Sequence, residues 1–368
     1  MTSLFDPLQI GAIHANSRIA MAPLTRNRAD AHQVPSELAV TYYTQRATAG
    51  LIITEASQIS PSAQGYLDTP GIYSPEQVAG WKRITDAVHA EGGKIVIQLW
   101  HVGRISHTSL QPGGIAPVSS TARAAHCKTY VKEGFVDVSA PRALRTDELP
   151  GIVEQYRLAT RCALAAGFDG VEIHAANGYL LEQFLRDSIN DRTDAYGGSI
   201  ANRSRLLLDV THAVVAEAGA DRTGIRLSPV TPANDAALDS DSQALFNHVM
   251  AELAPLKLAF IHIVEGATGG PRDIAPFDYG ALRAIYKAGN PAGVWMVNNG
   301  YTREMAIDVI ASGAADMVAF GKPFISNPDL VLRLAQNAPL NPLDPSTLYG
   351  AGAKGYTDYP TLAAASAD

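Results

Sequence analysis

The 368-residue chain is 46% hydrophobic and carries a formal net charge of −7, with a pI near 5.8. A large core is therefore possible, in one large domain or two smaller ones, and the lack of a basic stripe argues against a nucleic-acid partner. Residues 1–11 lack the features of a signal peptide and no apolar run has membrane-spanning length, so we expect a cytoplasmic protein without a membrane partner.

Short apolar segments alternate with helical patterns along the chain. Segments that are apolar on both faces are typical of strands in a buried parallel sheet. The predicted strands are 19–25, 51–57, 94–101, 170–176, 223–228, 260–265, 294–300 and 317–321. The predicted helices are 37–49, 75–91, 155–167, 201–218, 241–253, 279–288, 303–312 and 328–336. Eight strand–helix units predict an α/β fold, the closed (β/α)8 TIM barrel.

Three segments fall outside this alternation. A β-hairpin is expected at 8–15, below the barrel, and a long insertion at 102–145 follows the third strand, where such loops often cover a site. A tail begins at about 338. No linker divides the sequence, so residues 1–368 are predicted to form a single TIM-barrel domain.

A doubly wound nucleotide-binding fold is the competing architecture. Its glycine fingerprint must follow the first strand and open a helix. The GxGxxG pattern of this chain, at 350–355, follows the last helix and leads into a non-helical segment. We interpret it as a coincidence within a surface tail.

Strand alternation directs several polar side chains into the barrel near the strand ends. Gln98, Trp100, His174 and Arg226 share the inward parity, and barrel enzymes carry their chemistry at this rim. Taken alone, each residue has a simpler interpretation. His174 could be a hydrogen-bonded core histidine, Trp100 could pack at the barrel mouth, and Arg226 could form a salt bridge with Glu172. Together, the polar residues at one rim favour a binding site.

The segment His174-Ala175-Ala176-Asn177-Gly178-Tyr179 is the most informative part of that rim. A histidine, an amide and a phenol arrive together at the end of the buried strand that starts at Gly170. Buried polar groups without partners cost free energy. Their convergence therefore indicates a ligand.

Two glycine-bearing turns end the last two strands. They are Asn298-Asn299-Gly300 and Gly321-Lys322-Pro323, at the position where this fold commonly holds phosphate. Glycine lets backbone N–H groups approach a phosphate, and Lys322 adds charge. The simpler alternative is that the glycines only turn the chain and that Lys322 is solvated.

An ordered set of motifs resembles the Old Yellow Enzyme family over nearly the whole chain. Within the family the sequence looks most similar to the yeast enzymes and to the bacterial N-ethylmaleimide and pentaerythritol tetranitrate reductases. Iron–sulfur relatives carry a cysteine cluster, whereas this chain has only Cys127 and Cys162. The motifs are Met21-Ala22-Pro23-Leu24-Thr25-Arg26, Thr54-Glu55-Ala56, Gln98-Leu99-Trp100, His174 to Tyr179, Arg226-Leu227-Ser228-Pro229, the segment 324–330 and the tail segment 355–362.

The resemblance implies non-covalently bound FMN, transient binding of NADPH as hydride donor, and hydride transfer to a small electron-poor alkene. Thr25 would donate to flavin O4, Gln98 and Arg226 would bind the pyrimidine edge, and Gly300 with Lys322 would help hold the phosphate. The residues expected to bind the cofactor are Pro23, Leu24, Thr25, Ala56, Gln98, His174, Arg226, Asn299, Gly300, Gly321 and Lys322.

The resemblance also implies roles around the substrate. His174 and Asn177 would hydrogen-bond its carbonyl or nitro oxygen, and Tyr179 would protonate the α-carbon. Tyr66 and Tyr349 would wall the pocket beside Trp100. The family usually has arginine where this chain has Lys322, so bidentate phosphate binding would be replaced by a point charge. The nitrate-ester reductases usually have histidine at Asn177, which points to a yeast-type site.

Three other functions are alternatives to this one. Nitrate-ester or nitro-compound reduction at the same flavin site is the alternative within the family. A barrel lyase or aldolase would need a Schiff-base lysine or a metal cluster, and the sequence shows neither spacing, so no metal is expected. A non-catalytic flavin sensor would leave Tyr179 without a purpose. A monomer or homodimer is expected.

Overall fold

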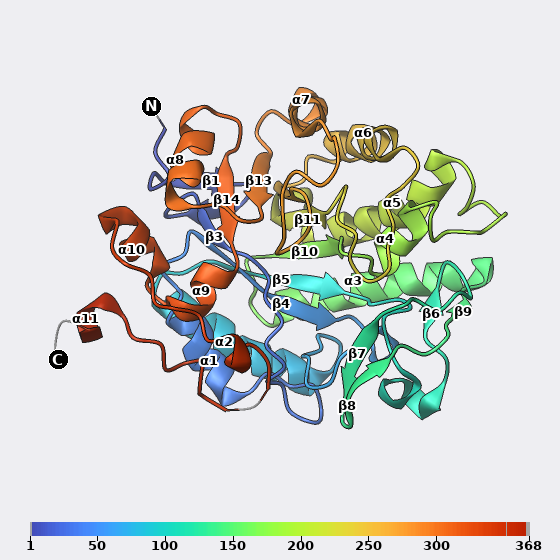
Figure 1. Cartoon of the computed structure of the whole chain (residues 1–368), viewed down its shortest axis with the longest axis horizontal. Coiled ribbons are helices and arrows are strands. Elements are labelled where there is room, and N and C mark those ends of the chain that lie inside the picture. The colour runs from blue at the N-terminus through green and yellow to red at the C-terminus, as the bar shows by residue number, and fades with distance from the viewer. Residues whose placement is uncertain (1, 351, 366–368) are drawn as a thin grey trace.

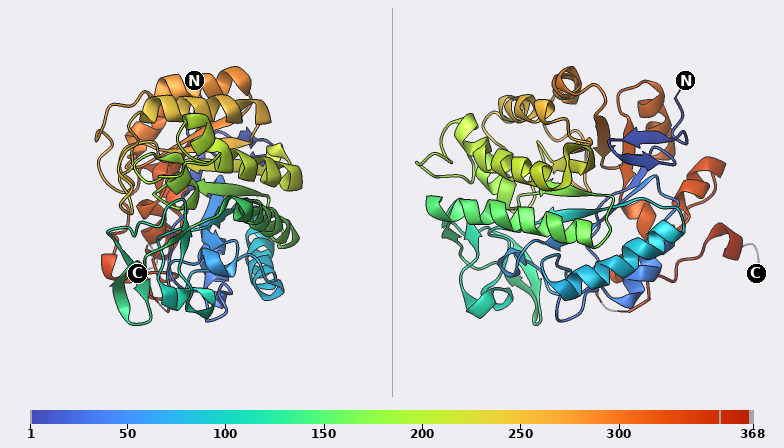
Figure 2. Two further views of the ribbon diagram at one scale, coloured as in Figure 1. Left: turned by 90° about the vertical axis from the view of Figure 1, so that its right-hand side faces the viewer. Right: turned by 180° about the vertical axis from the view of Figure 1, so that it is seen from behind.

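A computed structural model describes residues 2–350 and 352–365. Eight parallel strands close into a barrel, and helices surround it (Figures 1 and 2). In barrel order the strands are β3 (Ile19–Met21), β4 (Leu51–Gln58), β5 (Ile95–Trp100), β10 (Gly170–Ala175), β11 (Thr223–Leu227), β12 (Phe260–Val264), β13 (Val294–Asn298) and β14 (Met317–Phe320). The predicted TIM barrel is confirmed, and the doubly wound alternative is excluded.

Eight helices match the predicted ones, with shifted ends. They are α1 (Glu37–Thr44), α2 (Pro75–Ala90), α3 (Leu149–Ala165), α5 (Ile200–Ala218), α6 (Ser242–Leu253), α7 (Tyr279–Gly289), α8 (Arg303–Ala311) and α10 (Leu330–Gln336). The prediction missed α4 (Leu180–Leu185), α9 (Lys322–Ser326) and α11 (Leu362–Ala365). All six residues of α4 are buried, so no polar face marks its helical period. In the described part of the chain, no helix is long and apolar enough to cross a membrane.

Alternation along the strands divides the core into two layers. Ile97 and Ile173 face outward and pack in the layer between strands and helices, as predicted. Val96 faces inward and packs with Met296 and with Ile13 of the N-terminal hairpin. That hairpin, β1 (Leu8–Ile10) with β2 (Ile13–Ala15), therefore covers the barrel interior with apolar side chains.

The insertion at 102–145 folds into two small sheets at the end of β5. β6 (Val118–Ser119) pairs with β9 (Arg142–Ala143), and β7 (Lys128–Val131) pairs with β8 (Gly134–Asp137). Side chains from the insertion pack against Trp100, so the insertion packs against the end of β5.

The GxGxxG pattern lies at the surface, as predicted, with Gly352 to Lys354 exposed, but the segment around it is attached to the barrel. The Arg26 guanidinium donates to the carbonyls of Leu348 (2.9 Å) and Gly355 (2.7 Å). Tyr356 is fully buried and stacks on Tyr42, with ring centroids 4.2 Å apart. These contacts hold the segment after α10 close to the barrel mouth, where Tyr349 lines the cavity.

Candidate active site

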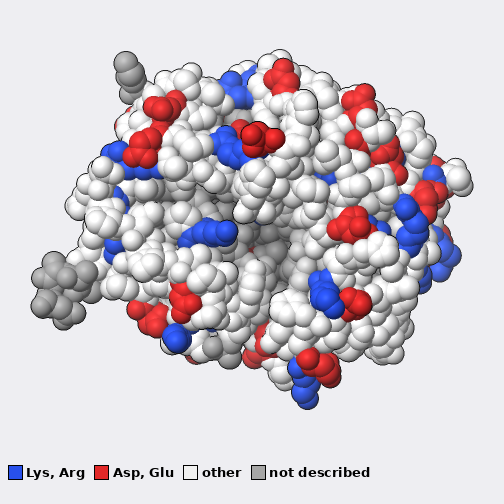
Figure 3. All heavy atoms as spheres, in the orientation of Figure 1, with Lys and Arg blue, Asp and Glu red and all other residues white. Residues whose placement is uncertain are grey.

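A cavity of about 560 Å³ opens at the carboxyl ends of the barrel strands. Figure 3 shows a deep hollow near the centre of this face of the molecule. The lining includes all the predicted site residues except Tyr66, namely Pro23, Leu24, Thr25, Ala56, Gln98, Trp100, His174, Asn177, Tyr179, Arg226, Asn299, Gly300, Gly321, Lys322 and Tyr349. The structure thus brings residues from most of the barrel strands to one place.

A bulge in β4 delivers Ala56 to the cavity. Ile53 pairs with Val96 and Ala56 pairs with Gln98, so β4 contains one residue more than β5 between these two pairs. The extra residue lets Ile53 and Ala56 face the same interior, which simple alternation forbids.

A buried hydrogen-bond network fixes the cavity floor. Gln98 Nε2 donates to Glu172 Oε1 at 2.7 Å, and Glu172 Oε2 lies 2.7 Å from His262 Nδ1. Arg226 Nη2 donates to Asn298 Oδ1 at 2.9 Å. The simpler alternative for Arg226, a salt bridge to Glu172, does not form in the described chain: Glu172 bonds Gln98 of β5 and His262 of β12.

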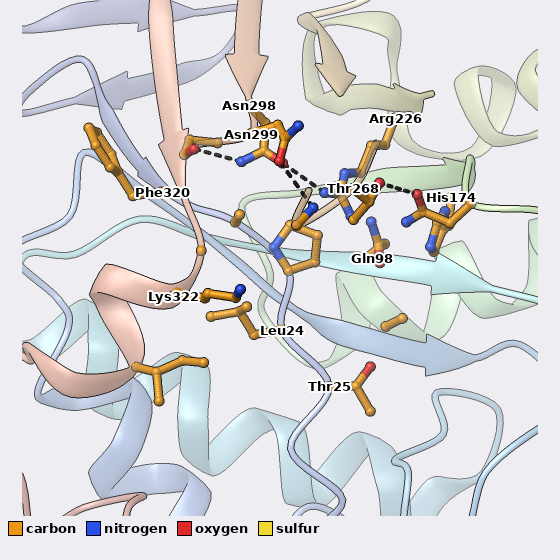
Figure 4. A pocket seen from close by; sticks show the side chains of 18 of the residues that line it. Leu24, Thr25, Gln98, His174, Arg226, Thr268, Asn298, Asn299, Phe320 and Lys322 are labelled. Atoms are coloured by element: carbon orange, nitrogen blue, oxygen red, sulfur yellow. Dashed lines mark hydrogen bonds between the residues drawn. The ribbon is translucent and has the colours of Figure 1, made fainter. Parts of the chain in front are cut away.

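Two polar groups of this floor are free to bind a ligand. Because its amide nitrogen is held by Glu172, Gln98 is left with an acceptor oxygen for a ring N–H. Arg226 Nε is buried and has no partner among the described residues, so it is a donor that a bound carbonyl oxygen or ring nitrogen would satisfy. Figure 4 shows Gln98, Arg226 and His174 grouped on one side of the pocket, with Lys322 and Leu24 across from them.

His174 is an uncharged imidazole at the end of β10. Burial, followed by the charges of Arg226 and His262, holds the pKa of His174 well below its usual value. Its ring stacks beside Trp100, with centroids 6.3 Å apart, and its Nδ1 is buried without a partner in the described residues. At neutral pH it therefore offers one N–H without adding positive charge.

We expect His174 to stay neutral well below pH 6.5, where an ordinary histidine is half protonated. The unfolded chain would take up this proton and the folded chain would not, so His174 lowers stability as pH falls below 6.5. An NMR pH titration of the histidine rings, with His174→Asn to assign the signal, measures this. A signal titrating near pH 6.5 would contradict the assignment of a neutral ring.

Tyr179 is a protonated phenol beside that imidazole. Its ring packs edge-on against both His174 and Trp100, at 5.1 and 4.9 Å between centroids. Burial raises the pKa of Tyr179, and its hydroxyl lies 3.2 Å from that of Tyr66. Tyr66 is set back from the lining and stacks on Trp100. Tyr179 can therefore donate a proton at neutral pH.

Asn177 lies in a tight turn of the chain between His174 and Tyr179. Its φ is +59°, its N–H donates to Ser228 Oγ at 2.8 Å, and its carbonyl accepts from Asn234 Nδ2 at 2.8 Å. The next residue must be glycine, because a Cβ on Gly178 would lie 2.5 Å from the Ala233 carbonyl oxygen. The turn thus fixes the backbone of Asn177 at the cavity wall.

The opposite end of the cavity is suited to an anion. Gly300, with φ +67°, and Gly321 leave the backbone open there, and Lys322 is exposed beside them, with no ion pair recorded in the described chain. The side chain of Asn299 binds the loop after β12 and is not free for a phosphate. Its amide bonds the Gly269 N–H (3.0 Å) and the carbonyl of Glu265 (2.6 Å).

Several residues that line the cavity were not predicted from the sequence. Thr268, Gly269 and Gly270, in the loop after β12, line the cavity, as do Tyr301 and Phe320. The glycine-rich sequence of that loop, Gly266 to Gly270, was the available signal. Its position over the cavity depends on the Asn299 amide, which no sequence pattern reveals.

Comparison with known proteins agrees with this geometry. Residues 3–341 match the NADH:flavin oxidoreductase / NADH oxidase family. The chain belongs to this family. It is 48% identical to 12-oxophytodienoate reductase 1 of Oryza sativa subsp. japonica, over 98% of this chain and 93% of that protein. The putative 12-oxophytodienoate reductase 4 of the same plant is also 48% identical, with the same coverage.

Solved structures give the same result. The structure of morphinone reductase in complex with tetrahydroNAD superposes with a TM-score of 0.92 at 46% identity, covering 98% of each chain. The Old Yellow Enzyme homologue from Zymomonas mobilis gives 0.93 at 45% identity, covering 98% of this chain and all of that one. The resemblance to the Old Yellow Enzyme family is confirmed, and with it a flavin oxidoreductase. The expected likeness to the yeast enzymes and the nitrate-ester reductases stays a prediction.

Proposed function

We propose that the protein is an ene-reductase that binds FMN non-covalently and uses NADPH to reduce activated C=C bonds of α,β-unsaturated carbonyl or nitro compounds. The proposal rests on one observation: a neutral imidazole, an amide and a protonated phenol at the end of β10 face one cavity. Two oxygen-binding groups and one acid are what the reduction of a polarised alkene requires.

The cavity floor fits the cofactor that the family implies. Gln98 would accept from the pyrimidine N–H, Arg226 would donate to the neighbouring oxygen or nitrogen, and Gly300, Gly321 and Lys322 would surround the phosphate. Thr25, Pro23 and Ala56 line the cavity between these ends. When bound, FMN supplies the hydride transfer between nicotinamide and alkene. The fixed charge of Arg226 favours an electron-rich ring beside it.

The residues at the end of β10 would act on the substrate. His174 and Asn177 donate hydrogen bonds to the carbonyl or nitro oxygen, where negative charge develops as the β-carbon is reduced. Tyr179 gives its proton to the α-carbon, and solvent restores it. Trp100 and Tyr349 shape the pocket around the alkene. Because one cavity serves both reactants, NADPH and alkene would bind in turn and the kinetics would be ping-pong.

The direct test is the colour and chemistry of the purified protein. We expect a yellow protein, or a colourless one that takes up one FMN per chain. NADPH and NADH should be compared as donors under anaerobic conditions, followed by a panel of enones, enals, imides, nitroalkenes and nitrate esters. A protein that takes up no FMN would contradict the proposal. NADPH oxidation without reduction of any alkene would revive the sensor alternative.

Lys322→Ala gives a test of the phosphate end. Loss of a single exposed ammonium should weaken FMN binding by about threefold to tenfold at low salt, with a smaller effect at high salt because ions screen it. Riboflavin, which lacks the phosphate, is the matched ligand. Equal weakening for FMN and riboflavin would contradict a phosphate contact at Lys322.

A further inference from the structure

The side chain of Asn177 has a protein partner that fixes its orientation. Thr268, in the loop between β12 and α7, places its Oγ1 2.6 Å from Asn177 Oδ1 (Figure 4 shows Thr268 on the same side of the pocket as His174). An amide can present either its oxygen or its nitrogen to a ligand. The contact with Thr268 therefore decides which of the two atoms faces the cavity.

The Thr268 hydroxyl donates in this bond, because the atom that faces it is Asn177 Oδ1 and an amide oxygen only accepts. Thr231 Oγ1 lies 2.6 Å from the Gly266 carbonyl oxygen and must donate its hydrogen there, because a carbonyl oxygen only accepts. Thr231 can then only accept from Thr268, at the longer distance of 3.4 Å. The Thr268 hydrogen therefore has two possible acceptors, and the nearer one is Asn177 Oδ1.

The loop that carries Thr268 is held on both sides of it. Asn299 Nδ2 donates to the Ala267 carbonyl at 2.9 Å, and Asn299 Oδ1 accepts from the Gly269 N–H at 3.0 Å. Gly266, with φ +75°, has a Cβ position 2.3 Å from the Arg272 Cα, so this close turn requires glycine. The hydroxyl of Thr268 is therefore supported although the loop is exposed.

We propose that Thr268 is a positioning residue that determines substrate specificity. It does not bind the substrate itself, but it orients the Asn177 amide so that Nδ2 faces the cavity and can only donate a hydrogen bond there. The inference rests on the proposed function and deepens it. A site with a fixed amide donor selects substrates whose activating group offers an acceptor oxygen, as ketones, aldehydes and nitro groups do. It selects against groups that need an acceptor from the protein.

Thr268→Val tests this with unreactive ligands of the FMN-loaded protein. Cyclohexanone has an oxygen that only accepts, whereas the cyclohexanol hydroxyl can also donate to a reversed amide. Binding would be measured from the perturbation of the flavin spectrum. We expect Thr268→Val to weaken cyclohexanone binding by about twofold to tenfold, the value of one net hydrogen bond, and to change cyclohexanol binding by less than about twofold.

Two further variants serve as controls. Thr268→Ser keeps the hydroxyl and should restore cyclohexanone binding. Thr231→Val removes a loop anchor but leaves the Thr268 hydroxyl with Asn177, so it should bind cyclohexanone within about twofold of the wild type. Equal loss for both ligands in Thr268→Val, equal loss in Thr231→Val, or no rescue by serine would each overturn the inference.

These results separate the inference from the function on which it rests. A wild-type protein that reduces enones while Thr268→Val binds cyclohexanone normally would overturn the role of Thr268 alone. A wild-type protein that takes up no FMN would overturn the proposed function, and the role of Thr268 with it.

Discussion

Replacing Tyr179 with phenylalanine should slow alkene reduction by about 10²- to 10⁴-fold, the usual contribution of a positioned general acid. The ring contacts with His174 and Trp100 would remain, so the pocket should keep its shape. Burial raises the pKa of Tyr179, so the acid form persists through the neutral range. Wild-type activity should therefore fall only as pH rises through that raised value. Stopped-flow reoxidation of the reduced protein by 2-cyclohexenone measures the effect.

The reductive half-reaction is the internal control for this variant. Reduction by NADPH needs no proton from Tyr179 and should stay within a few-fold of the wild type. Tyr66→Phe removes only the hydroxyl 3.2 Å away and should have a much smaller effect than Tyr179→Phe. Undiminished alkene reduction in Tyr179→Phe would remove this residue from its proposed role.

Replacing His174 with alanine should raise the barrier to alkene reduction by about 3 kcal/mol, or about 10²- to 10³-fold in rate, because one of two donors to the developing oxyanion is lost. His174→Asn retains an N–H donor of similar reach and should recover part of the loss. The rates should be compared across pH 6–8. The lowered pKa of His174 keeps the ring neutral over this range. The pH profiles of the wild type and of His174→Asn should therefore have the same shape, with no titration step due to His174.

The FMN content of each His174 variant is its necessary control, because the ring also lies at the cavity floor. Rates should be expressed per bound flavin. A His174→Ala protein that reduces 2-cyclohexenone at the wild-type rate per flavin would contradict the role of the imidazole as a donor.

The barrel and most of its rim followed from the sequence because both rest on local periodicity. Alternation of apolar residues along short strands placed Gln98, His174 and Arg226 inside the barrel, and each lines the cavity. The same reasoning placed Ile97 and Ile173 against the helices. The family resemblance supplied the flavin, which no residue pattern alone could name.

The features that the sequence did not reveal depend on partners distant along the chain. Glu172 was considered only as a possible salt-bridge partner of Arg226, yet it bonds Gln98 and His262, which come from β5 and β12. Ala56 reaches the cavity only through a bulge that breaks strand alternation. Asn299 was expected to bind the cofactor and lines the cavity, but no sequence pattern indicated that its side-chain amide also holds the loop after β12. Side-chain amides and bulges are set by tertiary contacts, and alternation carries no information about them.

The proposed function requires that this cavity pass a hydride from a nicotinamide nucleotide to an activated alkene. The most direct measurement is an anaerobic stopped-flow experiment in which NADPH-reduced, FMN-loaded protein is mixed with 2-cyclohexenone. We expect the flavin absorbance to return with one equivalent of cyclohexanone formed per flavin. A flavin that stays reduced with every alkene of the panel and is reoxidised only by oxygen would contradict it.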